Sequence, residues 1–236
     1  MISPREQSLG ALRPLYDRKD ATYFSAERID LVKLINRSGL KVLEIGCGEG
    51  DTGRALLEIG TARKLSGVEM VASRAERART VFDDVRIGNV EEMEFDWEPG
   101  EFDCLVFGDV LEHLANPWGL LKRLRPFLAD DGIAVASVPN VKHLSVVANL
   151  ILRDEWRYVE SGVLDQTHLR FFTRSSAVSL FSESGYSTDL VRPSFNGRRY
   201  SIPNRLTLGA FAGFLAQRWL MRFRAAADGP EEHPTK

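Results

Sequence analysis

The sequence predicts an α/β fold with a doubly wound parallel sheet. Between residues 41 and 139, short apolar segments rich in β-branched residues alternate with segments of helical periodicity. Strands that alternate with helices of about 8–12 residues specify βαβ units and a parallel sheet with helices on both faces. The predicted strands are almost continuously apolar, as strands are when both of their faces are covered.

The predicted elements follow one another in a regular order. A helix is expected over residues 25–37, with Gly39 as its C-cap. Five strands are expected at 41–46, 64–69, 85–88, 102–108 and 132–138, with helices at 52–59, 72–81 and 118–128. After an irregular stretch over 153–170, a helix over 174–184 and a strand over 186–191 complete the prediction.

Length and composition exclude several classes of protein. The 236 residues suit one elaborated domain, and a net charge of −2 argues against a protein that coats nucleic acid by bulk charge. The two cysteines, Cys47 and Cys104, lie in apolar segments and form no disulfide framework. The N-terminus lacks the apolar core of a signal peptide, and the longest apolar run, 206–216, is far shorter than the roughly 18 residues that span a bilayer. We therefore expect a cytoplasmic protein.

A glycine-rich turn follows the first predicted strand. Three glycines stand at alternate positions, Gly46, Gly48 and Gly50. Glycines at the carboxyl end of such a strand let the backbone turn tightly and approach a ligand. The spacing differs from the G-x-G-x-x-G of dinucleotide folds, and Glu44, Glu49 and Asp51 surround the turn. These carboxylates favour a cationic or zwitterionic ligand over a pyrophosphate, although an ordinary glycine turn would also explain the motif alone.

Polar residues end the next three strands as well. Glu69 comes 25 residues after Glu44, where an acid accepts hydrogen bonds from ribose hydroxyls. Asn89 follows the third strand and, with the Val90 backbone, is placed to read an adenine edge. Asp109 ends the fourth strand. The four strand ends predict one elongated site for a nucleoside with a charged tail.

The segments VLEIGCGEG, GVEM, GNVEE, FDCLVFGDVLEHL and LRPFLADDGIAVASVPN resemble the class I S-adenosylmethionine-dependent methyltransferases. The resemblance covers residues 41–140 and continues more loosely to about 193. It implies a Rossmann-like seven-stranded sheet whose last strand is antiparallel, so residues 186–193 should belong to the final β-hairpin. One departure is LADDG, where the family usually has a Lys-Pro-Gly-Gly turn.

The resemblance also implies S-adenosylmethionine as co-substrate and assigns roles to the strand-end residues. The residues expected to bind this methyl donor are Glu44, Gly46, Cys47 and Gly48 at the methionine end, Glu69 at the ribose, Met70, Asn89 and Val90 at the adenine, and Gly108 and Asp109 after the fourth strand. Tyr23, together with Tyr16 and Phe24, is expected to form a lid over the donor or to pack on the sheet.

Two further groups of residues point to the acceptor side of the site. Asp109, Glu112 and His113 are spaced i, i+3, i+4, so a helical turn would place them on one face towards the cleft. His168 lies among apolar residues in LDQTHLRFFT. Two histidines and two carboxylates beside a methyl donor suggest a general base or a divalent-metal site, while purely structural hydrogen bonding is the third interpretation.

The metal interpretation rests on a resemblance to ubiquinone-pathway O-methyltransferases and small-RNA 3′-end methyltransferases. Both have a carboxylate followed by Glu-His at this place, and the latter add a remote histidine. Here the first acid is the shorter Asp109, and the LEHL sequence also occurs in members of the class without a metal. We therefore favour His113 and His168 as general base and orienter, with a divalent metal left open.

The segments DVLEHLANPW, VPNVKH and D-x-T-HLRFFT are similar to a bacterial branch that often methylates sugar hydroxyls in glycan assembly. The expected function is therefore methyl transfer to a hydroxyl of a sugar or a sugar-containing intermediate. Arg170, Arg198 and Arg199 would be available to a phosphate on that substrate, or would form surface ion pairs. The alternatives are a small phenolic or prenylated acceptor, RNA as a distant third, and a non-catalytic donor-binding adaptor.

The chain is expected to divide into an N-terminal helical cap or lid over residues 1–40, the donor-binding core over 41–194 and a helical C-terminal extension over 195–236, disordered from about 225. Residues 205–224 combine arginines with large apolar residues, so a helix there would cover the domain or lie on a membrane surface. Association into a homo-oligomer is left open.

Overall fold

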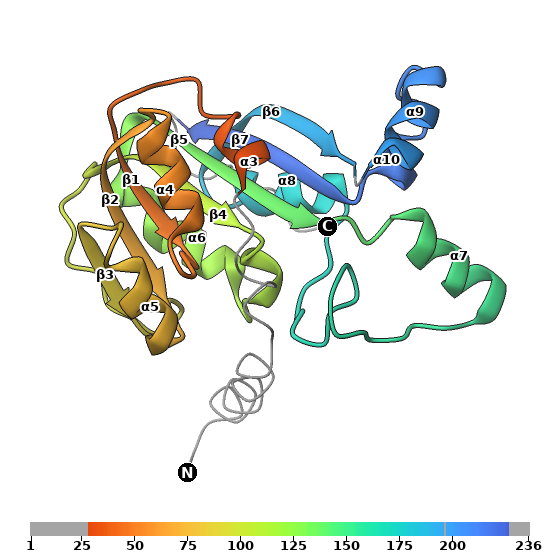
Figure 1. The fold of residues 1–236 in the computed structure, drawn as a ribbon, viewed down its shortest axis with the longest axis horizontal. Helices are drawn as coiled ribbons and strands as arrows, with labels where there is room; N and C mark the ends of the chain where they lie inside the picture. Colours follow the sequence, from red (N-terminus) through yellow and green to blue (C-terminus); the bar gives the residue numbers. More distant parts are fainter. Residues whose placement is uncertain (1–27, 196, 227–236) are drawn as a thin grey trace, which may run out of the picture.

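A seven-stranded sheet runs through the molecule in the order β3-β2-β1-β4-β5-β7-β6 (Figure 1). The computed structural model describes residues 28–195 and 197–226. The strands are β1 (Leu40–Ile45), β2 (Ala62–Glu69), β3 (Asp84–Ile87), β4 (Phe102–Gly108), β5 (Leu128–Pro139), β6 (Tyr186–Ser194) and β7 (Arg218–Ala225). The first five form parallel neighbours, and β7 runs antiparallel to both β5 and β6. The expected topology and final hairpin are confirmed.

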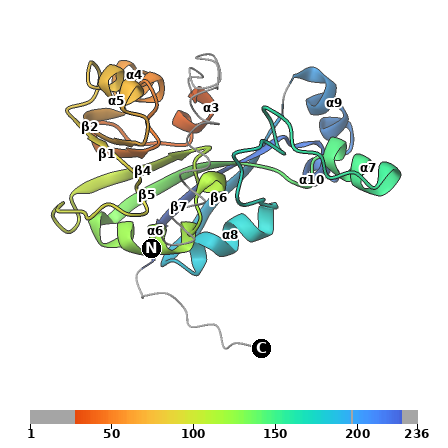
Figure 2. The same cartoon turned by 90° about the horizontal axis from the view of Figure 1, so that it is seen from below.

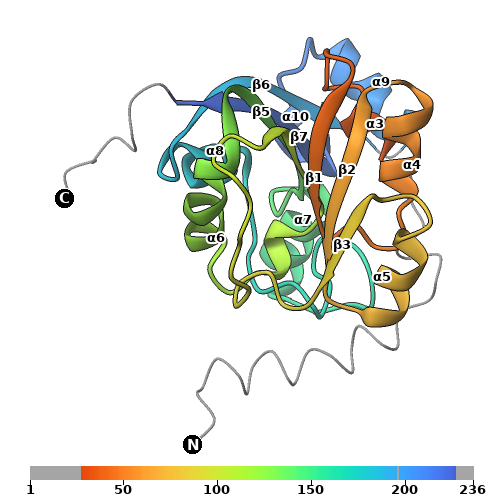
Figure 3. The same ribbon diagram turned by 90° about the vertical axis from the view of Figure 1, so that its left-hand side faces the viewer.

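Helices cover both faces of the sheet. Figures 2 and 3 show α3 (Ile29–Val32), α4 (Asp51–Glu58) and α5 (Ala72–Ala78) on one face, and α6 (Pro117–Leu124) and α8 (Arg174–Ser182) on the other. Side chains that alternate along each strand enter two separate apolar clusters: Leu43 and Ile45 belong to one, and Val42 to the other. The continuously apolar strands are thus explained by burial on both sides.

Local sequence signals set the bounds of the helices that flank the site. Asn116 caps α6, its side-chain oxygen accepting a hydrogen bond from the Gly119 N–H at 3.0 Å, and Pro117 occupies the first helical position. Pro126 follows in a 3-10 turn, so α6 ends at Leu124 and the expected helix over 118–128 is too long at its end. A capping box between Thr173 and Ser176 begins α8.

The helix expected over 25–37 is only partly present. Residues 25–27 lie outside the described residues, and the α-helical bonds of α3 stop at Val32. The following turn is tighter, because the Leu34 and Ile35 N–H groups bond to carbonyls three residues back. This turn buries both side chains against the sheet.

The segment 195–236 is helical only in its first half. It contains α9 (Arg198–Leu206) and α10 (Ala212–Leu215), but residues 218–225 form β7, so the helix expected over 205–224 is wrong there. Trp219, Met221 and Phe223 enter one apolar cluster and Leu220 the other, which is a strand period of two. The sheet therefore extends past the boundary expected at 194, and the tail from 227 lies outside the described residues.

One helix was not predicted. Helix α7 (Leu144–Arg153) occupies the chain between β5 and the irregular stretch, and it extends from the sheet at the same end of the molecule as α9 and α10 (Figure 1). None of the helices in the part of the chain that the structure describes is both long enough and apolar enough to cross a bilayer.

Candidate active site

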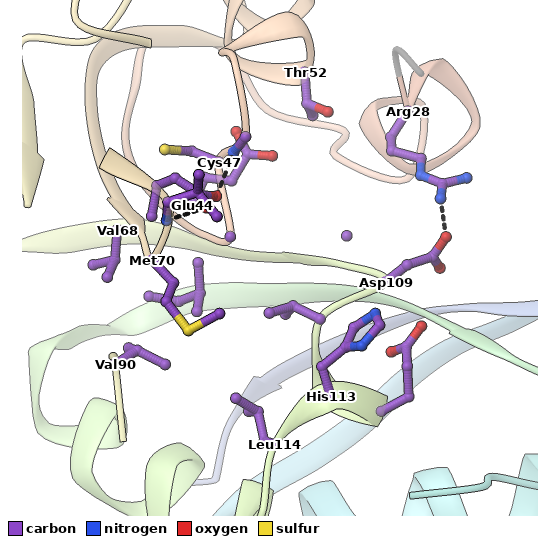
Figure 4. A pocket seen from close by; sticks show the side chains of 18 of the residues that line it. Arg28, Glu44, Cys47, Thr52, Val68, Met70, Val90, Asp109, His113 and Leu114 are labelled. Carbon is purple, nitrogen blue, oxygen red and sulfur yellow. Dashed lines mark hydrogen bonds and ion pairs between the residues drawn. The ribbon is translucent and has the colours of Figure 1, made fainter. Parts of the chain in front are cut away.

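A cavity of about 430 Å³ lies at the carboxyl ends of the parallel strands (Figure 4). The register places these ends level, because Ile45 of β1 stands opposite Val68 of β2 and Phe107 of β4. The donor-site residues expected from the sequence and described by the structure all line this cavity: Glu44, Gly46, Cys47, Gly48, Glu69, Met70, Asn89, Val90, Gly108 and Asp109. Tyr23, Tyr16 and Phe24 lie outside the described residues.

The glycine turn after β1 requires glycine for two reasons. Gly46 and Gly48 adopt left-handed backbone conformations, with φ of 74° and 57°. A Cβ at Gly46 would also lie 3.0 Å from Cγ2 of Val110 on the opposite wall. The turn therefore brings bare backbone to the cavity, as expected for a ligand-binding loop.

Glu69 joins the end of β2 to this turn. Its Oε2 accepts a hydrogen bond from the Gly48 N–H at 3.0 Å, and its Oε1 accepts one from the Val71 N–H at 2.8 Å. The side chain is buried, so the two bonds fix the carboxylate in the cavity wall. A carboxylate retains further acceptor positions, which suits the ribose contact expected from the sequence.

Glu44 lies beneath the turn in an environment that disfavours its charge. Burial raises the pKa of its carboxyl to about 8, opposed by a hydrogen bond with Thr52 and reinforced by the nearby Glu69 and Asp51. One of its oxygens has no hydrogen-bond partner among the described residues. A cationic ligand would favour the ionised form. Of the three acids around the turn, Glu49 instead pairs with Arg77 at 2.8 Å.

The far part of the cavity is suited to a flat, apolar ring. Met70 and Val90 line it, and Figure 4 shows them on the side of the cavity away from Arg28. Asn89 accepts a hydrogen bond from the Glu91 N–H at 3.1 Å, which holds its amide at the end of β3. The strand ends together therefore fit the nucleoside and charged tail of S-adenosylmethionine.

Asp109 is held by cations rather than aimed at the histidines. Its backbone is left-handed, with φ of 51°. Its carboxylate forms ion pairs with Arg28 and with Arg218, the latter at 3.0 Å, and accepts a hydrogen bond from the Ser137 hydroxyl at 2.6 Å. Neither arginine was singled out from the sequence. Arg28 follows no pattern there, and Arg218 lies in the segment interpreted as a helix.

The structure brings together the other three predicted residues. Candidate ligand atoms of Glu112, His113 and His168 all lie within 4.8 Å of one another. Leu111, Glu112 and His113 form a 3-10 turn, and the Glu112 carbonyl accepts hydrogen bonds from the N–H groups of Leu169 and Arg170 at 2.8 and 2.9 Å. These bonds hold the loop of His168 against the turn of His113. The helical spacing thus predicted two of the three clustered residues, Glu112 and His113, and misplaced Asp109, while His168 was expected from its own segment.

The histidine rings are oriented by backbone carbonyls. Nδ1 of His113 lies 3.1 Å from the Thr167 carbonyl oxygen, and Nδ1 of His168 lies 3.0 Å from that of Val163. In the neutral form a carbonyl partner places the ring proton on Nδ1 and the lone pair on Nε2. The ring centroids are 4.8 Å apart in an edge-to-face arrangement. Both Nε2 atoms are therefore suited to accept a proton or to bind a metal.

Glu112 is the buried acid of the cluster. Burial raises the pKa of its carboxyl to about 8, although its own backbone hydrogen bond, Arg28 and Arg218 oppose the rise. Neither carboxyl oxygen has a hydrogen-bond partner among the described residues. At neutral pH the carboxyl is therefore mostly protonated, unless a bound cation lowers its pKa.

Of the arginines expected to meet a phosphate, Arg170 does not line the cavity. Arg170 donates a hydrogen bond to the Ala115 carbonyl, and its guanidinium lies 5.8 Å from the centre of the Trp118 ring. Arg170 thus has a structural role, but its printed partners are a carbonyl and a ring rather than the acid of the expected surface ion pair. Arg198 and Arg199 lie in α9.

The chain is similar to known proteins in sequence and in fold. A family model described as a methyltransferase domain matches residues 16–191, more than half of the chain. A ubiquinone biosynthesis O-methyltransferase of Neisseria meningitidis serogroup A is 26% identical over 141 residues, which are 54% of this chain and 56% of that protein. The chain thus spans about half the length of that relative.

Solved structures share the fold at low sequence identity. An S-adenosylmethionine-dependent methyltransferase from Mesorhizobium loti aligns over 84% of this chain and 98% of its own, with a TM-score of 0.59 and 14% identity. The PH0226 protein from Pyrococcus horikoshii aligns over 89% and 98%, with a TM-score of 0.61 and 15% identity. The strand order, the glycine turn and the family match agree with these likenesses. The chain belongs to the family of S-adenosylmethionine-dependent methyltransferase domains.

Proposed function

We propose that this chain transfers the methyl group of S-adenosylmethionine to a hydroxyl group of a small acceptor. The observation that carries the proposal is the pair His113 and His168, which both line the donor cavity and whose rings are oriented by backbone carbonyls at Nδ1. The relatives named as ubiquinone biosynthesis O-methyltransferases support transfer to oxygen. A non-catalytic adaptor would have no need of two oriented histidines beside the donor.

Different residues of the chain bind the donor and activate the acceptor. S-adenosylmethionine, when bound, supplies an electrophilic methyl group on a sulfonium. The glycine turn and Glu69 hold the donor, and the negative charge of Glu44 would balance the positive charge of its tail. One histidine accepts the hydroxyl proton at Nε2, and the second orients the acceptor oxygen. Alignment of the oxygen about 3–3.5 Å from the methyl carbon supplies a large part of the rate.

The acceptor is more plausibly a phenolic or prenylated molecule than a sugar. The sequence favoured a sugar hydroxyl, but the cavity that the histidines line also contains Val110, Leu114, Pro139 and Val163, which can pack against an aromatic ring. Apolar walls suit an aromatic ring with one hydroxyl near a base. The names of the relatives point the same way.

A divalent cation is the second candidate for activating the hydroxyl. Two imidazoles and a carboxylate form a ligand set used by divalent transition metals, and the two buried Glu112 oxygens without hydrogen-bond partners fit it. Such a cation would supply Lewis acidity that lowers the pKa of the acceptor hydroxyl. We favour the histidine base, because Asp109, the fourth expected ligand, is engaged by Arg28, Arg218 and Ser137.

A direct assay tests the proposal. Purified protein is incubated with S-adenosylmethionine and one acceptor at a time, either a catechol carrying a short prenyl chain, an unprenylated catechol or a nucleotide sugar. Release of S-adenosylhomocysteine and a methylated product with either catechol is expected, and the mass spectrum locates the methyl on oxygen. Turnover with the nucleotide sugar alone would restore the sugar interpretation. Donor binding without turnover on any hydroxyl acceptor would favour the adaptor.

A further inference from the structure

Exposed apolar side chains gather in two segments of the molecule. Of the fourteen large apolar side chains exposed in the described residues, seven lie in 144–159 and four in 202–211. The first segment is α7 with the loop after it, and the second is the end of α9 with the turn into α10. Figures 1 and 2 both show these helices at the same end of the molecule, beyond the sheet. We call residues 144–159 and 202–211 the apolar end.

Helix α7 carries its polar residues Ser145, Asn149 and Arg153 on one side, and the rest of its surface is apolar, yet only Val146 is buried. Ile151 and Leu152 are 73% and 79% exposed. A helix with a wide apolar face normally packs that face against a core or a lipid surface. The described residues do not cover this face of α7, which makes it suited to another surface.

The turn between α9 and α10 shows the same property. Leu206 is 79% exposed and Leu208 is 97% exposed. Leu208 also has a left-handed backbone, with φ of 49°, which is unfavourable for an L-residue with a branched side chain. The turn thus holds a leucine outward in an unfavourable conformation, with almost no packing against the described residues.

The two segments are fixed to each other at their bases. The ammonium of Lys142 lies 4.5 Å from the centre of the Phe214 ring, and the rings of His143 and Tyr200 are 5.1 Å apart, edge to face. These contacts join the start of α7 to α10 and α9. The apolar end is therefore one connected region, from which both segments extend.

The charge of the apolar end is positive along both helical segments. Residues 132–153 and 195–217 contain no Asp or Glu, while Lys142, Arg153 and Arg205 are exposed there. The loop part of the apolar end contains Asp154 and Glu155 beside Arg157, so the positive charge lies along the helices. Apolar side chains among Lys and Arg are the composition of protein surfaces that lie in the interface of an anionic bilayer.

We propose that the apolar end docks the protein on an anionic lipid surface, an inference that goes beyond the proposed function. Ile151, Leu152, Leu206 and Leu208 enter the headgroup region, and the basic side chains contact lipid phosphates. The loop after α7 continues to Ser161, Gly162 and Val163, which line the cavity. The docked face is thus joined through one loop to the acceptor side of the site.

Vesicle flotation with the full chain tests this inference. Vesicles of phosphatidylcholine with an equal part of phosphatidylglycerol are compared with vesicles of phosphatidylcholine alone. The wild type should float with the anionic vesicles, and much less with the neutral ones or at high salt. The double variant Leu152→Asp/Leu208→Asp should bind the anionic vesicles at least about tenfold more weakly, because charged groups replace two inserted leucines.

A matched variant controls for general surface effects. Ile59 is 58% exposed at the end of α4, outside the apolar end, so Ile59→Asp should float like the wild type. Both variants should keep the wild-type affinity for S-adenosylhomocysteine, which shows that they fold. Absence of flotation by the wild type with anionic vesicles overturns the proposal. Equal losses in both variants also overturn it, as does a dimer in sedimentation velocity that the double variant abolishes while vesicle binding is unchanged.

Discussion

The guanidinium of Arg218 and the carboxylate of Asp109 form an ion pair, 3.0 Å between Nε and Oδ2, that joins the last strand of the sheet to the end of β4. Arg28 contacts the same carboxylate oxygen from the segment before α3. One acid thus connects three distant parts of the chain at the wall of the cavity. Its left-handed backbone suggests that the surrounding contacts, rather than local preference, hold it there.

Removing the charge of Asp109 should destabilise the protein. Asn tolerates the left-handed backbone, so Asp109→Asn chiefly removes the charge that faces two guanidinium groups. We expect the free energy of unfolding in urea to fall by about 2 kcal/mol. Asp96→Asn is the control, because the side chain of Asp96 is 85% exposed in its pair with Arg86, and solvent screening makes a much smaller loss the expected result. Equal losses of unfolding free energy in the two variants would mean that the ion pairs of Asp109 stabilise the protein no more than an exposed pair does.

Glu69 should determine donor affinity. Glu69→Ala removes a fixed carboxylate that already orients the Gly48 and Val71 amides, so the donor loses its ribose contact and the turn loses support. Affinity for S-adenosylhomocysteine in calorimetry should fall roughly 10- to 100-fold, as expected for about 1.5–3 kcal/mol. Glu58→Ala, at the exposed end of α4, should leave affinity unchanged. Wild-type affinity in Glu69→Ala would remove Glu69 from the donor site.

The two histidines should affect turnover more than donor binding. His113→Ala and His168→Ala each remove an imidazole from the acceptor side, and we expect kcat to fall about 10²- to 10⁴-fold. Donor affinity in calorimetry should stay within a few fold of the wild type. Full turnover by both variants on the true acceptor would show that proximity alone drives the reaction.

Treatment with a chelator distinguishes the general-base mechanism from the metal-dependent mechanism. With His113 or His168 as base, turnover should survive prolonged EDTA treatment. Loss of activity in EDTA and recovery with Mn²⁺ or Mg²⁺ would instead assign Glu112, His113 and His168 to a metal. In that case added Mn²⁺ or Mg²⁺ should not restore activity to Glu112→Gln, which is the matched control.

Stability without donor should decrease as pH rises through the neutral range. The folded-state pKa of both Glu44 and Glu112 is raised from 4.5 to about 8 by burial. Between these pH values the folded chain binds more protons than the unfolded chain. The contribution of each group to the free energy of unfolding therefore falls as the pH rises, by up to about 1.4 kcal/mol per pH unit. The contribution is complete below about 4.5 and is lost above about 8.

Urea unfolding at several pH values measures this dependence. Glu112→Gln should lose its share of the slope between pH 5 and 8, since an amide does not titrate. An exposed acid such as Glu58→Gln should keep the wild-type slope. A slope in Glu112→Gln that equals the wild-type slope would show that Glu112 titrates normally in the folded chain.

The βαβ part of the fold was predictable because each strand is buried on both faces and each helix on one. Val42 and Leu43 belong to opposite clusters, which makes the strand a continuous apolar run. Strand β7 was not recognised because arginines at 218, 222 and 224 interrupt its apolar residues at a spacing that also suits a helix. The structure shows where the charge of Arg222 is neutralised: it pairs at 2.5 Å with Asp189 of the neighbouring strand β6.

The donor side of the site was predictable because its residues follow directly after strands. The acceptor side depends on loops whose path is set by tertiary contacts. His168 reaches His113 only because the Asp165 carboxylate accepts hydrogen bonds from the Thr167 N–H and hydroxyl, which bends the loop, and because Glu112 binds the loop through its carbonyl. Arg28 and Arg218 had no sequence signal, since their shared partner, Asp109, is distant along the chain.

The position of β7 between β5 and β6 has a consequence for synthesis of the protein. Until residues 218–225 leave the ribosome, β5 has an open edge and β6 lacks the strand with which it pairs. Open edges pair readily with other chains, and incompletely folded domains of this size are prone to aggregate. The nascent chain also lacks Gln217 and Arg218 of the cavity wall until then. Closure of the sheet and completion of the active site therefore occur together, once residues 218–225 have been synthesised.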